Sequence, residues 1–117
     1  MPDKALTWLG SSRRDIQAFP AVARGLAGFQ LRRVQQGLDP DDWKPMQAVG
    51  PGVREIRIQV AGAHRVFYVA TRPEAIYVLH AFEKKTQKTS AQDLRIGRDR
   101  FRALKKLDLQ HGKERRG

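Results

Sequence analysis

The chain has 117 residues, which suits one domain with a single core, because two domains would each have too small an interior. It has no cysteine, which excludes disulfides and thiolate metal sites, and no run of roughly 18 apolar residues that would cross a membrane. Its 23 lysines and arginines against 12 acidic residues give a net charge of +11, which favours a nucleic acid partner over a merely solvated basic surface. The first ten residues include Asp3 and no long apolar core, so we expect no signal peptide and a cytoplasmic protein.

The first third of the chain predicts a short strand and two helices. We expect the strand over residues 6–9. Ser12 and Asp15 have the spacing of a capping box and begin a short helix, which Pro20 ends. A second helix over residues 21–36 is expected to bury a broad apolar face. The apolar residues expected on that face are Val22, Leu26, Phe29, Leu31, Val34 and Leu38.

The middle of the chain changes from a helical to a strand pattern. Residues 39–52 are rich in proline, glycine and aspartate, so we expect a connection that Trp43 and Met46 hold against the core. After it, apolar and polar residues alternate, and short turns separate three β-rich runs. The pattern predicts an antiparallel meander of three strands, over residues 53–60, 64–71 and 75–82.

The last third predicts one helix and a tail. Ser90 and Asp93 repeat the capping-box spacing, and the helix that follows carries an apolar stripe. The stripe consists of Leu94, Gly97, Phe101 and Leu104. Residues 1–107 are expected to form the domain, and residues 108–117 a loose basic tail. The predicted order is β-α-α-β-β-β-α, an α+β fold in which helices pack on an antiparallel sheet.

Most of the positive charge follows the last predicted strand. The stretch LHAFEKKTQKT, residues 79–89, passes directly from an apolar strand to a lysine-rich loop. Residues 83–117 hold 12 basic and 5 acidic residues, which is +7 of the total charge of +11. We therefore expect Lys84, Lys85 and Lys88 to face the polyanion.

The predicted strands carry further polar side chains near the same end of the sheet. Glu55 and Arg57 share one face, because side chains two positions apart on a strand point the same way. Each feature alone has an ordinary explanation, such as a surface ion pair for Glu55 and Arg57 or a structural hydrogen bond for His80. Several cations packed together repel one another, so the grouping favours a bound anion. The expected cations are Arg57, Arg65, His80, Lys84 and Lys85.

This grouping would suit cleavage of RNA. A base removes a proton from the 2′-hydroxyl, an acid protonates the leaving 5′-oxygen, and cations stabilise charge on the phosphoryl group. His80 is a candidate acid or base, and Glu55 is a second candidate base. Further candidate RNA contacts are Arg54, Lys88 and an aromatic ring, either Phe82 or Tyr68. The three histidines lack the spacing of metal ligands, so no metal or other cofactor is expected.

Four segments, SRRDIQAFP, GVREIRI, HRVFYVA and IYVLHAFEKKTQKT, carry a resemblance to a known family. In the same order, residues 5–107 resemble the phage-derived branch of the RelE/HigB toxins of type II toxin–antitoxin systems. The resemblance implies a microbial-RNase-like fold and an mRNA interferase, a hydrolase that cuts mRNA on the translating ribosome and inhibits translation. It also implies inhibition by a helix-turn-helix antitoxin.

The same resemblance implies site residues. The cations of the family's central strands and following loop correspond to Arg57, Arg65, Lys84 and Lys85, and His80 matches the LHAF motif. Founding members also use a tyrosine late in the chain, and this sequence has none after Tyr77. Either another residue takes that role, or activity is weaker.

Two other classes of function stay open from the sequence. One is a non-catalytic RNA-binding or ribosome-binding module, with the same charge and no turnover. The other is a DNA-binding accessory, which the last helix disfavours because its acids and bases alternate without a recognition-helix pattern. Binding alone predicts that Glu55→Gln and His80→Ala leave function unchanged, whereas catalysis predicts a large loss.

Overall fold

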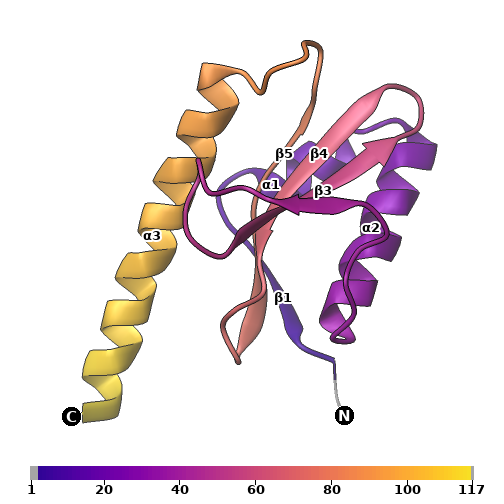
Figure 1. Cartoon of the computed structure of the whole chain (residues 1–117). Coiled ribbons are helices and arrows are strands. Elements are labelled where there is room, and N and C mark those ends of the chain that lie inside the picture. Colours follow the sequence, from indigo (N-terminus) through magenta and orange to yellow (C-terminus); the bar gives the residue numbers. More distant parts are fainter. Residues whose placement is uncertain (1–2, 117) are drawn as a thin grey trace.

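The computed structural model describes the backbone of residues 3–116 and the side chains of residues 3–110. The fold is α+β: one strand is followed by two helices, then by four consecutive strands and a last helix (Figure 1). In chain order they are β1 (Ala5–Trp8), α1 (Ser12–Gln17), α2 (Ala21–Gln35), β2 (Trp43–Pro45), β3 (Val53–Gln59), β4 (Ala63–Val69), β5 (Ala75–Glu83) and α3 (Ala91–Arg116).

The five strands of the described chain form one sheet in the order β1-β5-β4-β3-β2. The meander of β3, β4 and β5 is antiparallel, as the sequence predicts. The prediction of a wholly antiparallel sheet is wrong, because β1 pairs in parallel with β5 from Ala5↔Ala75 to Trp8↔Val78. A parallel pair requires a long crossover, and here two helices and three other strands separate the two partners.

The predicted connection over residues 39–52 contains a strand that sequence patterns missed. β2 is three residues long and pairs with β3 at the edge of the sheet, with Lys44 opposite Glu55. Pro45 is compatible with this edge position, because an edge strand can leave one side of its backbone unpaired. Met46 is buried after β2, so this part of the connection is held to the core as predicted.

The N-cap residue of α1 lies one position earlier than the sequence predicts. Ser11, rather than Ser12, occupies the N-cap position, and its Oγ donates to Asp15 Oδ2 at 2.8 Å. Ser12 is the first helical residue, is buried, and donates its Oγ to the Val78 carbonyl oxygen at 3.1 Å. Ser12 therefore fastens α1 to β5.

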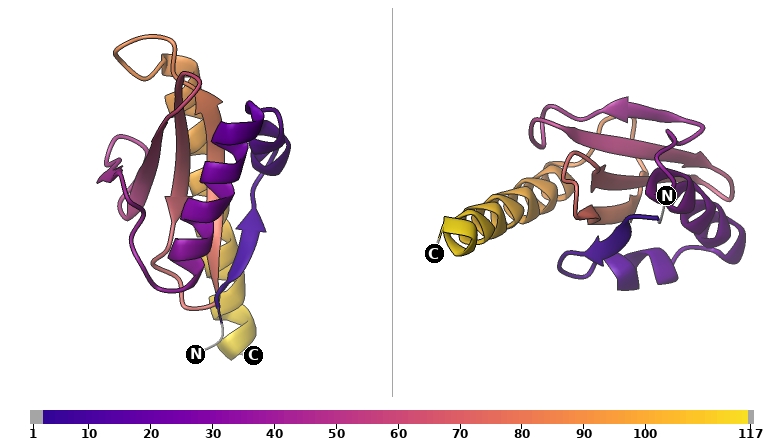
Figure 2. Two further views of the ribbon diagram at one scale, coloured as in Figure 1. Left: turned by 90° about the vertical axis from the view of Figure 1, so that its right-hand side faces the viewer. Right: turned by 90° about the horizontal axis from the view of Figure 1, so that it is seen from below.

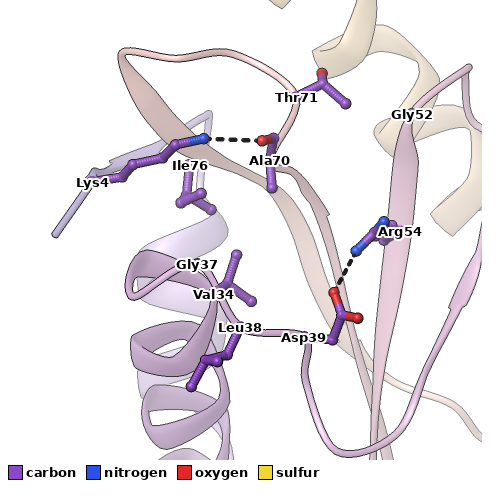
Figure 3. A pocket seen from close by; sticks show the side chains of 10 residues that line it. All are labelled: Lys4, Val34, Gly37, Leu38, Asp39, Gly52, Arg54, Ala70, Thr71 and Ile76. Carbon is purple, nitrogen blue, oxygen red and sulfur yellow. Dashed lines mark hydrogen bonds and ion pairs between the residues drawn. The ribbon is translucent and has the colours of Figure 1, made fainter. Parts of the chain in front are cut away.

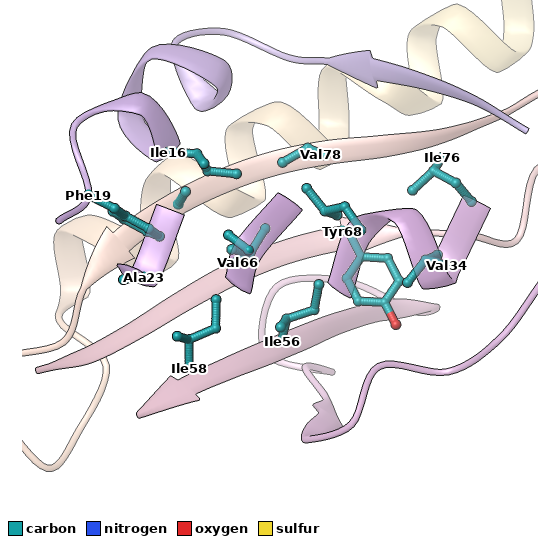
Figure 4. Close-up of a cluster of buried hydrophobic side chains, with 13 residues drawn as sticks. Ile16, Phe19, Ala23, Val34, Ile56, Ile58, Val66, Tyr68, Ile76 and Val78 are labelled. Carbon is teal, nitrogen blue, oxygen red and sulfur yellow. The ribbon is translucent and has the colours of Figure 1, made fainter. Parts of the chain in front are cut away.

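α2 buries only part of the predicted face: Leu31 and Val34 are buried as expected, and two alanines are buried in addition. Its buried apolar residues are Ala23, Ala27, Leu31 and Val34, which pack in the core of the first sheet face (Figure 4). Val22 and Phe29 are 61% and 56% exposed, and Leu38 is also exposed. Ala23 and Ala27 allow the first half of the helix to approach the sheet closely, so small side chains make the contact there.

α3 lies on the side of the sheet opposite α1 and α2 (Figure 2). It carries the predicted apolar stripe, which packs into the second core cluster. Asp93 N–H donates to Ser90 Oγ at 3.0 Å, as expected of the predicted capping box. Gly97, Phe101 and Leu104 are buried against the sheet. The backbone is helical to Arg116, and residues 91–116 contain no proline to end the helix. The predicted basic tail over residues 108–117 lies largely outside the side chains that the structure describes.

The sheet therefore has two covered faces. The first face, under α1 and α2, is apolar and includes Ile56, Ile58 and Val66. The second face packs against α3 and the loop between β2 and β3. On this face, β3 and the start of β4 carry the charged side chains of Glu55, Arg57 and Arg65. Among residues 3–116, no helix is long and apolar enough to span a membrane.

Candidate functional site

The pairing register places polar side chains in two neighbouring rows across the second face of the sheet. Adjacent strands lie about 4.8 Å apart, so opposite residues of a row are close neighbours. The first row runs His80, Phe67, Glu55 and Lys44, from β5 to β2. The second row runs Phe82, Arg65 and Arg57, from β5 to β3.

Glu55 lies at the centre of the charged part of these rows. Its carboxylate is 0% exposed, and Oε1 lies 3.7 Å from Arg65 Nε and 3.9 Å from Lys44 Nζ. Both distances exceed that of a hydrogen bond, and neither carboxylate oxygen has a hydrogen-bond partner among the described residues. Charge attraction alone therefore opposes the cost of burying this carboxylate.

Arg57 and Arg65 stand directly opposite each other on β3 and β4. Like charges in this position repel. Arg65 is buried and donates Nη1–H to the His64 carbonyl oxygen at 3.0 Å, whereas the Nε–H groups of both arginines are buried without a hydrogen-bond partner among the described residues. Burial lowers the pKa of Arg65, Glu55 opposes this shift, and Arg57 adds to it. The pair presents donors that nothing in the described chain accepts.

Lys84 extends this group from the loop after β5. Its backbone N–H donates to the Ala63 carbonyl oxygen at 2.7 Å, which ties the start of the loop to β4. Burial lowers the pKa of Lys84 below its ordinary 10.5, with further lowering by Arg65, Lys44 and Arg57 and opposition by Glu55. The charges of the sheet residues therefore act on the Lys84 ammonium. We call Lys44, Glu55, Arg57, Arg65 and Lys84 the sheet cluster.

His80 lies outside the sheet cluster, because Phe67 separates it from Glu55 in the first row. Its Nε2 lies 2.8 Å from Asp93 Oδ1, and its ring stacks on Phe82 with centroids 5.0 Å apart. Burial lowers the pKa of His80, and the hydrogen bond to Asp93 opposes this shift. With Nε2–H donating to the carboxylate, neutral His80 fastens the start of α3 to β5.

The remaining predicted RNA contacts are dispersed. Lys85 and Lys88 are exposed and line a hollow of about 210 Å³ with Lys84, Ser90 and Asp93. Phe82 is 8% exposed and has one ring face against His80. Tyr68 is wholly buried on the first face, where its ring belongs to the core and offers no face to a base (Figure 4).

Arg54 lies on the first face, away from the sheet cluster. Its Nη1 lies 3.0 Å from Asp39 Oδ1, and its guanidinium covers the Trp43 ring at 4.0 Å. With Lys4 it lines a separate hollow of about 260 Å³ (Figure 3). Lys4 Nζ in that hollow is already bound to the carbonyl oxygens of Ala70 and Arg72.

Sequence reasoning missed two residues of this region. Lys44 was expected in a connection, and a strand of three residues is too short for alternation to reveal it. Asp93 was expected only as a helix cap, although it also holds His80. Among residues 3–110, no three His, Asp or Glu side chains converge in a way that would hold a metal ion.

The fold and the sheet cluster define a small, basic α+β protein with uncompensated cations on one face of a mixed sheet. Residues 14–102 match the family described as Phage derived protein Gp49-like (DUF891), a span that includes every residue of the sheet cluster. The chain belongs to this Gp49-like family of phage-derived proteins, a toxin family of the RelE/Gp49 type. A comparison with curated proteins found no match.

Proposed function

We propose that the chain is the toxin of a type II toxin–antitoxin module and an endoribonuclease that cleaves mRNA on the translating ribosome. The observation that carries this proposal is the sheet cluster, in which four cations surround one buried carboxylate. Membership of a toxin family associated with RNase-like activity supports the same reading.

The cations of the sheet cluster suit a scissile phosphate. Arg57 and Arg65 have buried Nε–H donors without acceptors, and an anion between them would supply the acceptors and relieve their repulsion. Negative charge on the phosphoryl oxygens grows as the 2′-hydroxyl attacks, so the attraction is strongest in the transition state. No metal is required for this stabilisation.

The same cluster offers a base and an acid for the two proton transfers. In the proposed reaction Glu55 takes the proton of the 2′-hydroxyl while its oxygen attacks phosphorus, and the bond from phosphorus to the 5′-oxygen breaks. Lys84 gives a proton to that leaving oxygen, which yields a 2′,3′-cyclic phosphate and a 5′-hydroxyl. A lowered pKa makes the Lys84 ammonium a better acid near neutral pH.

The other predicted residues take supporting roles in this proposal. His80 is a positioning residue, which holds α3 against β5 through Asp93. Lys85 and Lys88 contact the RNA backbone next to Lys84, because all three line one hollow. The proposed partner is a helix-turn-helix antitoxin, and the proposed place of action is the cytoplasm. A neighbouring reading frame for a small helix-turn-helix protein would support this partner.

One observation favours the non-catalytic alternative, an RNA-binding or ribosome-binding module. Glu55 is wholly buried, so Lys44, which is half-exposed, must move before a 2′-hydroxyl reaches the carboxylate. Glu55→Gln separates the two functions. Catalysis predicts that this variant loses about 100-fold or more in the cleavage rate of bound RNA. A binding module predicts that wild type and Glu55→Gln arrest growth equally and that neither cuts transcripts.

Inducible expression in a bacterium tests the proposal directly. Wild type is expected to stop growth and to create new 5′ ends in mRNA, and Arg57→Ala/Lys84→Ala is expected to do neither. The matched control is Arg24→Ala/Arg32→Ala, which removes the same charge from exposed positions on α2. Normal growth and intact transcripts with soluble wild type would overturn the toxin assignment.

A further inference from the structure

A second cationic surface lies beside α3. The loop between β2 and β3 lies beside this helix (Figure 1). Together they line an open hollow of about 260 Å³. Three cations of α3, Arg98, Arg102 and Lys105, line it together with Val49, Gly50 and Phe101, and no carboxylate does. We call this the α3 hollow. The catalytic proposal above makes no use of it.

The walls of the α3 hollow are firmly joined. Arg98 Nε–H donates to the Ala48 carbonyl oxygen at 2.7 Å, which clamps the loop to the helix. Gly50 lies against the Phe101 ring so closely that a Cβ at this position would overlap the ring. The shape of the hollow therefore depends on packed backbone. All three of its cations are exposed, and Arg98 is the one that is bound to the loop.

The other two cations are largely free to bind an anion. Arg98, Arg102 and Lys105 are spaced four and three residues apart, so they lie along one side of α3. Arg102 contacts Asp99 at 3.4 Å, an exposed pair of the kind that contributes little. Lys105 Nζ lies 5.7 Å from the centre of the Phe101 ring and has no ion pair among the described residues.

The α3 hollow borders the sheet cluster. A Cβ on Gly97 would lie 3.0 Å from the Phe67 ring and 3.1 Å from Val49, so α3 lies directly on both residues. Phe67 is the cross-strand neighbour of Glu55, and Val49 lines the α3 hollow. Phe67 and Val49 are themselves buried, so a strand of RNA with its phosphate at the sheet cluster would reach the α3 hollow over the surface above them.

We propose that the α3 hollow binds the phosphodiester backbone of RNA beyond the scissile phosphate. This inference rests on the proposed function, which supplies RNA as the ligand. The buried Phe101 ring offers no open face for a base, so the contact is to the backbone and tolerates any sequence. Its contribution is to RNA affinity and leaves the chemical step unchanged.

Fluorescence anisotropy with single-stranded 2′-O-methyl RNA tests this, because that RNA lacks the attacking hydroxyl. The test variant is Arg102→Ala/Lys105→Ala, and Arg24→Ala/Arg32→Ala is the control of equal charge. With RNA of about 12 nucleotides, the test variant should bind several-fold more weakly, and RNA of about 4 nucleotides should bind it as it binds wild type. The slope of log affinity against log salt should become shallower by about 1.4, since each phosphate contact contributes about 0.7.

Two results would overturn the inference. One is an equal loss of affinity in the test and control variants, which would make the effect one of net charge. The other is an unchanged affinity for the longer RNA. A ribosome-pelleting arm without mRNA identifies the source of the backbone: loss of pelleting in the test variant alone indicates ribosomal RNA, and normal pelleting indicates the mRNA strand.

The outcome is separable from that of the proposed function. Cleavage of unmodified mRNA at saturating concentration should proceed at the wild-type rate in Arg102→Ala/Lys105→Ala. Loss of cleavage in every form of the protein would remove the catalytic proposal, while the length-dependent and salt-dependent binding would still decide whether the α3 hollow binds RNA.

Discussion

Glu55 is the residue on which the sheet cluster depends. A wholly buried carboxylate without hydrogen bonds is costly unless nearby cations offset its desolvation. Here Arg65 and Lys44 lie near it at distances too long for hydrogen bonds, so neither cation is fully compensated. Glu55 holds the cations close together and leaves their donors unused. That arrangement is expensive for stability and favourable for binding an anion.

Lys84 gives a prediction about the pH dependence of cleavage. The pKa of Lys84 is lowered below its ordinary 10.5. A general acid must be protonated, so the cleavage rate should fall on the alkaline side, and the fall should begin below pH 10.5. Lys84→Arg keeps the charge but hardly gives up a proton. We expect this variant to bind RNA nearly as wild type does and to cleave at least about 100-fold more slowly.

Single-turnover cleavage and RNA anisotropy, measured across the alkaline range, check this expectation. Lys88→Arg is the control, because Lys88 is exposed in the same loop. A wild-type rate in Lys84→Arg would remove Lys84 as the acid and leave it a role in phosphate binding.

His80 gives a prediction about stability. Its folded-state pKa lies below the ordinary 6.5, so on acidification the unfolded chain binds the proton first. The free energy of unfolding should therefore fall as pH drops below 6.5, until the folded-state pKa is passed. His80→Gln keeps a donor for Asp93 and cannot titrate, so its stability should fall less over the same range.

Urea unfolding between about pH 7.5 and about pH 5 measures the difference, with His80→Gln compared to wild type at each pH. Carboxylates titrate equally in both proteins, so the comparison isolates His80. Parallel stability profiles would show that His80 does not carry the effect.

At the scale of elements, α2 contains two glycines that no contact requires. A Cβ at Gly25 or Gly28 would have no atom within 4 Å. Glycine in a helix interior costs about 1 kcal/mol relative to alanine, chiefly in backbone entropy. Gly25→Ala and Gly28→Ala should each raise the free energy of unfolding by up to about 1 kcal/mol.

Gly97→Ala is the matched control on α3, and it should destabilise the protein. Its Cβ would lie 3.0 Å from Phe67 and 3.1 Å from Val49, which is tighter than most Cβ contacts, so these buried side chains would have to shift. Urea unfolding of the three variants should give opposite signs for the two helices. Destabilisation by Gly25→Ala would contradict the exposed placement of that side of α2.

The elements that sequence patterns predicted are those set by local signals. Turns and alternation revealed β3 to β5, and the Ser90 cap revealed the start of α3. Pairing of β1 with β5 is a contact between distant segments, and β2 is too short for a periodic signal. In α2 the exposed Val22 and Phe29 misled the prediction, because hydrophobicity alone does not distinguish a helix contact made through alanines.

At the scale of the molecule, the site is a product of register. Strand alternation places Arg57 with Glu55, but only the pairing of three strands brings Arg65 opposite Arg57 and Lys44 opposite Glu55. The same register puts Phe67 between Glu55 and His80. The sequence did not reveal this separation, because His80 lies shortly before the lysine-rich loop and was therefore grouped with it. Docking of α3 then supplies Asp93, so His80 becomes a link between sheet and helix.

The whole molecule also shows where its core ends. Leu104 is the last buried residue of α3 within residues 3–110, and Leu109 is 69% exposed. Asp108 pairs with Arg72 in the turn between β4 and β5, and this is the last ion pair between helix and sheet within residues 3–110. A chain that stops after Asp108 retains both the core contacts and this ion pair.

We therefore expect deletion of residues 109–117 to change the free energy of unfolding by no more than about 0.5 kcal/mol. The deleted segment has three basic residues and one acidic residue, so RNA affinity should fall modestly at low salt and little at high salt. Asp108→Ala in the full chain provides the comparison, since it removes the tie to Arg72 and keeps the segment. Urea unfolding and RNA anisotropy of both proteins measure the two effects. A loss of several kcal/mol on deletion would mean that the segment makes contacts that stabilise the folded domain.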